Sequence, residues 1–111
     1  MFDATGIPTQ TPPLGFYYHH KSASDAHPED HAYEVMGIGY HTETGEHTVL
    51  YRPIHTDAWA YENGKMTYVR PLEMFMGTVE KEGITTPRFI QIIDPEIIET
   101  LRARACDMYP L

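Results

Sequence analysis

Short apolar segments alternate with turn-forming residues over most of the chain, which predicts a mainly β protein. The clearest strand is expected over residues 32–41. Side chains alternate along a strand, so Met36, Ile38 and Tyr40 should share one face and Val35 should lie on the other. Two glycines also fall on the Val35 face, and such a pair predicts a bulge, a sharp bend or the close approach of another backbone.

Turn signals divide the rest of the chain into further strands. These are expected over residues 16–21, 47–53, 59–62, 65–70, 77–80 and 87–93. The pair Asn63 and Gly64 predicts a tight hairpin, because a type I′ turn needs positive φ at both central positions. Hairpin loops are expected over 42–46 and 81–83, each containing a glycine. Pro71 should end a strand and start a helical turn.

The last segment changes from strand to helix periodicity. Asp94 is a good N-cap, Pro95 suits the first helical position, and Glu96 favours the positive end of the helix. Five apolar residues fall within one arc of about 100°: Ile97, Ile98, Leu101, Ala105 and Met108. Cys106 lies off this arc, so we expect it to be partly exposed.

These elements predict a small SH3-like antiparallel barrel with a short helical turn and one C-terminal α-helix. A sandwich is less suitable, since it needs about 100 residues and the strand region has fewer than about 80. We expect an extended lead-in over residues 1–15, a small β-barrel domain over 16–93, and a helix over 94–111 packed on it.

Composition narrows the function classes. The chain has 111 residues, 8 basic and 16 acidic, with a net charge of −8 when histidine is neutral. This balance argues against nucleic acid as the main partner, because phosphate contacts need a basic face. No run of about 18 apolar residues is present, so no membrane span is expected. The single cysteine and the absence of a signal-like start predict a cytoplasmic protein.

Five segments together carry a family resemblance. They are residues 17–21, 33–44 (YEVMGIGYHTET), 50–52 (LYR), 68–75 (YVRPLEMF) and 87–89 (PRF). In this combination the chain resembles the bacterial domain-of-unknown-function family 1653, over roughly residues 16 to 89. It departs from the pattern in a longer loop at 22–31, a longer connection at 56–64, and Tyr68 where Trp is common. The resemblance implies a short uncharacterised domain and supplies no mechanism.

Polar residues inside these segments form the candidate site. They are His19, Lys21, His41, Glu43, Tyr51 and Arg70. At one mouth of a small barrel they would form a cationic pocket, in which arginine offers a planar fork for carboxylate or phosphate. We therefore predict a binding module for a small anionic ligand or a partner protein, rather than an enzyme. A purely structural alternative is that His41 and Glu43 cap a hairpin while Arg70 anchors the helical turn or pairs with Glu43 or Glu73.

Two other function classes remain open. A metal-assisted hydrolase would use His19, His41 and Glu43, since imidazole and carboxylate are zinc ligands. A structural or assembly protein would form a homodimer through Trp59 or the C-terminal helix. His27 and His31 are four residues apart, but the intervening Pro28 favours a loop. No metal site and no cofactor are predicted.

Overall fold

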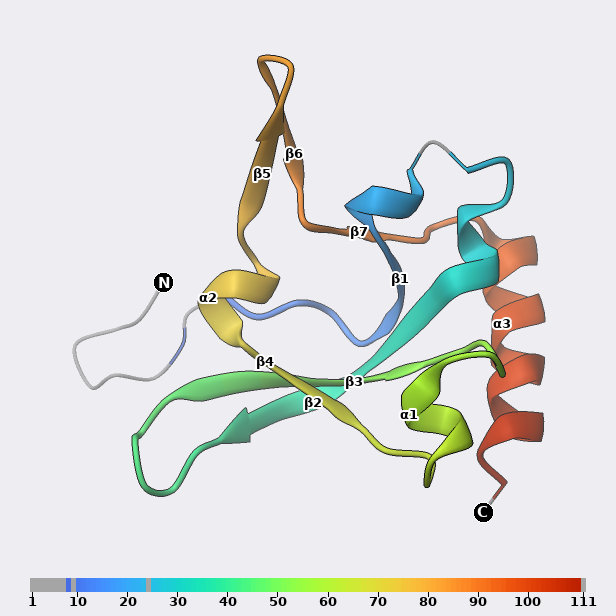
Figure 1. Ribbon diagram of the computed structural model, residues 1–111, viewed down its shortest axis with the longest axis horizontal. Helices are drawn as coiled ribbons and strands as arrows, with labels where there is room; N and C mark the ends of the chain where they lie inside the picture. Colours follow the sequence, from blue (N-terminus) through green and yellow to red (C-terminus); the bar gives the residue numbers. More distant parts are fainter. Residues whose placement is uncertain (1–7, 9, 24, 111) are drawn as a thin grey trace.

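The computed structural model describes residues 8, 10–23 and 25–110. Its main element is a curled antiparallel sheet of five strands in the order β4-β3-β2-β1-β7 (Figure 1). The strands are β1 (Gly15–His19), β2 (Ala32–Tyr40), β3 (His47–Pro53), β4 (Tyr68–Pro71) and β7 (Phe89–Gln91). The mainly β fold is confirmed, and its SH3-like assignment stays a prediction.

Smaller elements connect these strands. They are the helical turns η1 (His20–Ser22), η2 (Pro28–His31), α1 (Trp59–Glu62) and α2 (Leu72–Phe75), and the strands β5 (Thr78–Lys81) and β6 (Ile84–Pro87). The β5–β6 hairpin projects away from the main sheet (Figure 1). Within the described residues, no helix is long and apolar enough to cross a membrane. The predicted lead-in falls partly on residues 1–7 and 9, which lie outside the described part.

The main sheet is buried on both faces, and strand alternation decides which side chain enters which core. Phe16 and Ala32 belong to a core that faces the C-terminal helix, whereas Tyr17 and Val35 belong to a core on the opposite face. The helix-side core comprises Phe16, Ala32, Ile54, Ile92, Leu101, Ala105 and Met108. The second core comprises Tyr17, Val35, Val49, Tyr51, Leu72, Phe75 and Phe89.

A bulge interrupts β2 between Val35 and Gly37, as the two glycines predicted. It inserts one extra residue, Met36, and so reverses the alternation beyond it. Ile38 therefore lies on the same face as Val35, because their partners on β3 are two residues apart. The prediction that these two side chains face opposite ways was wrong, since it assumed a regular strand.

The Asn63–Gly64 pair ends a helical turn and does not form the predicted hairpin. The segment expected as a strand is α1, and both the backbone N–H and the side-chain amide of Asn63 donate to the Trp59 carbonyl, at 3.0 and 2.9 Å. Gly64 and Lys65 follow with φ of 129° and 52°. Asn and Gly tolerate positive φ, so the pair suits a helix C-terminus as well as a hairpin. The strand after it, β4, begins only at Tyr68.

The segment predicted as one strand over 87–93 belongs to two strands. The hairpin turn at Glu82 and Gly83 has positive φ at both positions, and the return strand β6 starts already at Ile84. After Pro87 the chain leaves this hairpin and enters β7, which pairs with β1. This pairing sets Phe89 directly beside His19.

The C-terminal helix α3 (Pro95–Met108) forms as predicted. The Asp94 carboxylate accepts a hydrogen bond of 2.9 Å from the Glu96 N–H, which confirms the N-cap. Leu101, Ala105 and Met108 are buried against the sheet, and Cys106 is exposed as expected.

Truncating the buried stripe of α3 should destabilise the protein. Leu101 is fully buried, so Leu101→Ala should lower the free energy of unfolding by about 2–5 kcal/mol through lost burial and a cavity. Urea unfolding followed by circular dichroism measures this change. Ile93→Ala is the matched control, because Ile93 is 80% exposed and its truncation should cost no more than about 0.5 kcal/mol. Equal effects of the two variants would contradict the packing described.

Candidate functional site

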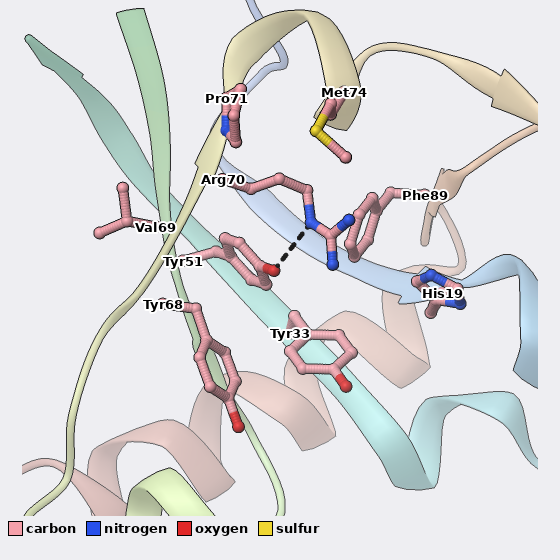
Figure 2. Close-up of a pocket in the computed structure, with 9 residues that line it drawn as sticks. All are labelled: His19, Tyr33, Tyr51, Tyr68, Val69, Arg70, Pro71, Met74 and Phe89. Atoms are coloured by element: carbon pink, nitrogen blue, oxygen red, sulfur yellow. Dashed lines mark hydrogen bonds between the residues drawn. The ribbon is translucent and has the colours of Figure 1, made fainter. Parts of the chain in front are cut away.

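A pocket of about 460 Å³ opens on the face of the sheet opposite α3, over the second core (Figure 2). All five strands of the main sheet and α2 supply its walls. The nine lining residues are His19, Tyr33, Tyr51, Tyr68, Val69, Arg70, Pro71, Met74 and Phe89. The antiparallel register brings these segments together although they are distant in sequence.

Aromatic rings form the floor of the pocket. The Tyr51 ring centroid lies 5.4 Å from that of Tyr68, 5.5 Å from Phe89 and 5.6 Å from Tyr33. Beneath them Phe75 stacks on Phe89, with centroids 4.2 Å apart and planes within 7°. Such packed rings have little freedom to move, so the floor is formed before any ligand arrives.

Arg70 is a half-buried cation above this floor. Its Nε donates to the Tyr51 hydroxyl at 3.2 Å, and its guanidinium carbon lies 5.2 Å from the Phe89 ring centroid. Among the described residues, no carboxylate lies within ion-pair distance of Arg70, and none accepts from its two terminal nitrogens. Arg52, by contrast, pairs with Glu34 at 2.7 Å. The fork of Arg70 therefore faces the pocket with no partner for its terminal nitrogens in the described part of the chain.

His19 lies at the edge of the pocket as a neutral imidazole. Burial, followed by the positive charges of His20, Arg70, Lys21 and Arg88, lowers its pKa to about 4. Its Nδ1 accepts the Lys21 backbone N–H at 3.2 Å. The proton of the neutral ring is therefore assigned to Nε2, which is left as a hydrogen-bond donor.

The tyrosine hydroxyls add neutral polar groups. Burial raises the pKa of Tyr33, and the neighbouring Tyr68 and Tyr51 raise it further, so the Tyr33 phenol stays protonated at neutral pH. Figure 2 shows the hydroxyls of Tyr33 and Tyr68 directed away from the Arg70 guanidinium. The pocket thus has one fixed charge and several neutral donors.

The six residues predicted as one site are distributed over three places. His19, Tyr51 and Arg70 line the pocket. Lys21 lines a separate hollow beside the β5–β6 hairpin. His41 and Glu43 lie in the turn after β2.

His41 and Glu43 are held in that turn by local hydrogen bonds. The Nδ1 of His41 accepts the backbone N–H groups of Glu43 and Thr44 at 3.3 and 3.2 Å, as the structural alternative predicted. His19 follows Tyr18, which pairs with the first residue of β2, whereas His41 follows the last. A strand of this length spans roughly 25 Å, at about 3.3 Å per residue. The structure therefore does not bring His19 together with His41 and Glu43.

Sequence reasoning missed most of the pocket's apolar lining. It selected polar side chains inside the matched segments, so the predicted site did not include Tyr33, Tyr68, Val69, Pro71, Met74 and Phe89. A usable signal was present, because all nine lining residues fall within the five segments that carry the family resemblance.

A second polar cluster lies next to Tyr33. His55 Nδ1 is 2.7 Å from an Asp57 carboxylate oxygen, and this hydrogen bond lowers the pKa of Asp57. The His55 ring centroid is 5.3 Å from that of His31 and 5.8 Å from that of Tyr33, and its buried Nε2 has no hydrogen-bond partner within residues 8, 10–23 and 25–110. Among the described residues, no group of three or more His, Cys, Asp or Glu side chains is placed to hold a metal ion.

The low pKa of His19 makes stability depend on pH. Below the usual value of 6.5 the unfolded chain binds a proton at this position, while the folded protein does so only near pH 4. The contribution of neutral His19 is therefore present above pH 6.5 and is lost as the pH falls towards 4. His19→Asn keeps an acceptor for the Lys21 N–H but does not titrate.

Urea unfolding of wild type and His19→Asn at several pH values measures this effect. The stability of wild type relative to the variant should fall between pH 6.5 and 4. A difference that stays constant over this range would contradict the depressed pKa.

Comparisons with known proteins agree on a family. The profile described as "Protein of unknown function (DUF1653)" matches residues 15–91, which is more than half of the chain. A DUF1653 protein from Bordetella bronchiseptica, solved by crystallography, is similar in fold, with a TM-score of 0.58 and 24% sequence identity over 79% of this chain and 99% of that one. The search of curated proteins found no match. With its fold and its five matched segments, the chain belongs to the DUF1653 family.

Proposed function

We propose that this DUF1653 chain is a non-catalytic binding domain whose aromatic pocket takes a small anionic ligand. The observation that carries the proposal is the Arg70 guanidinium, which is half-buried and has no carboxylate partner among the described residues. A partly desolvated charge is costly unless it is paired. An anionic group bound at its terminal nitrogens would supply that pairing.

The electrostatic surroundings of the pocket support an anion. Apart from the neighbouring His20, the groups whose charge acts on the pKa of His19 are Arg70, Lys21 and Arg88, and all three are cations. The chain as a whole carries a net charge of −8. A local excess of cations on an acidic protein is the kind of field that concentrates small anions and still repels polyanions such as nucleic acid.

The pocket has the character of a pre-formed small-molecule site. Its volume of about 460 Å³ falls within the range of ligand pockets, and its walls are largely apolar with a few convergent polar groups. The hydrolase hypothesis has no comparable support, because His19 is separate from His41 and Glu43. The cytoplasmic location and the absence of a membrane partner remain predictions from the sequence.

Assembly is a second candidate function, favoured by one observation. Trp59, the single tryptophan of the chain, is 69% exposed on α1. Exposed tryptophans are rare on monomer surfaces and are enriched at interfaces. A homodimer through Trp59 is compatible with ligand binding, since Trp59 does not line the pocket.

Removing the guanidinium should abolish selective anion binding. A thermal-shift and NMR panel of small carboxylates and phosphates should show binding to wild type and at least a tenfold loss in Arg70→Gln. Hydrogen bonds to charged groups contribute about 1.5–3 kcal/mol, which corresponds to a loss of this size. Arg102→Gln is the control, because Arg102 is exposed on α3 and carries the same charge. Equal affinities in the two variants would refute the proposed role of Arg70.

The assembly candidate predicts a concentration-dependent mass. In sedimentation equilibrium, wild type should approach twice the monomer mass, and Trp59→Ser should remain a monomer. Tyr40→Ser removes another exposed aromatic side chain, 62% accessible on β2, and should still dimerise. A wild-type protein that stays monomeric at high concentration would remove this candidate.

A further inference from the structure

We infer that the ligand of this pocket is a free aromatic monocarboxylate with an otherwise uncharged body. The inference rests on the proposed function, which requires only an anion at Arg70. Three features of the pocket restrict the class of anion further. They are the number and sign of its charged side chains, the orientation of the guanidinium and the aromatic walls.

The charge inventory favours a single negative charge. Arg70 is the one permanently charged residue among the nine that line the pocket, and none of the nine is acidic. His19 is neutral at pH 7, because its pKa is about 4. Within the lining, a carboxylate matches the one guanidinium, whereas a phosphate dianion carries one charge more than the lining supplies and would depend on Lys21 and Arg88 outside it.

The same inventory disfavours a zwitterion. The ammonium group of a free amino acid would need a carboxylate or several acceptors, and the pocket lining offers no carboxylate. Beyond the lining, Lys21 and Arg88 act on His19 as positive charges and would repel an ammonium group. The body of the ligand should therefore be uncharged.

The guanidinium is oriented for a planar, two-oxygen partner. Its Nε is held by the Tyr51 hydroxyl and its carbon lies near the Phe89 ring, so both terminal nitrogens remain available together. An arginine fork of this kind binds a carboxylate through two parallel hydrogen bonds. A lysine at this position would supply the charge without that geometry.

The walls select an aromatic body. Beyond the guanidinium, the pocket presents the rings of Tyr33, Tyr51 and Tyr68 (Figure 2). Rings pack favourably against other rings in edge-to-face or offset geometry. A pocket of about 460 Å³ suits a molecule with one ring or two, which is why we assign a free small molecule and not a polypeptide terminus.

A matched series of probes tests each element of the inference on the full chain. The reference probe is 3-phenylpropionate. Propionate lacks the ring, 3-phenylpropionamide lacks the charge, L-phenylalanine adds an ammonium group, and 2-phenylethyl phosphate replaces the carboxylate. An acetylated tripeptide ending in phenylalanine represents a polypeptide carboxylate. Dissociation constants at pH 7 come from ¹H–¹⁵N NMR titrations, which also locate each probe.

The expected result is that 3-phenylpropionate binds at least fivefold more tightly than every other probe and shifts the amide signals of the pocket strands. Arg70→Gln should weaken 3-phenylpropionate at least tenfold and bring it to the level of the amide. Arg70→Lys should recover only part of the affinity. The comparison of carboxylate with amide in wild type needs no variant, so it stands even if Arg70→Gln fails to fold.

Each contrary outcome has a distinct meaning. Tighter, Arg70-dependent binding of the phosphate, propionate, L-phenylalanine or the tripeptide would overturn this inference and leave the proposed anion site intact. Failure of every anionic probe to bind in an Arg70-dependent way would overturn both.

Discussion

The structure depends on one constraint, which is that the central strands must bury side chains on both faces of a single sheet. In β1, Phe16 enters the core beneath α3 and the next residue, Tyr17, enters the core beneath the pocket. A shift of register by one residue would exchange the two sets. The pairing of β1 with both β2 and β7 therefore determines where the helix docks and which residues meet in the pocket.

The two faces serve different purposes because they are covered differently. The helix-side face is closed by α3, which lies beyond the residues matched by the family profile. The opposite face is only partly covered by α2, and the uncovered part is the pocket. There the sheet exposes rings and a guanidinium where a buried core would hold aliphatic side chains. The exposed rings and the guanidinium together form a rigid surface that can bind a polar group.

The sequence predicted elements well where one local signal dominates. The N-cap at Asp94 and the strands β2 and β3 follow directly from short-range patterns. It failed where the same signal serves two structures: Asn63–Gly64 suits both a hairpin and a helix end. The sequence also did not predict which face each side chain of β2 occupies beyond the bulge. One extra residue moves every later side chain of the strand to the opposite face.

The candidate site shows the same division. His19, Tyr51 and Arg70 could be selected from the sequence because they are polar residues inside the segments that carry the family resemblance. The pairing register of distant strands determines which of the six polar residues come together. His41 does not join the pocket because it lies in the turn at the far end of β2. Phe89 became part of the pocket only because the chain leaves the β5–β6 hairpin and pairs with β1. No local pattern encodes that crossing.

The ring of Phe89 is held between the stacked ring of Phe75 and the guanidinium of Arg70, so it belongs to the core and to the pocket at once. Tyr51 has the same double membership. A substitution at either position should therefore change the stability of the fold and the shape of the pocket together. Substitutions that change the pocket without changing the core are instead expected at exposed lining positions such as Val69 and Met74.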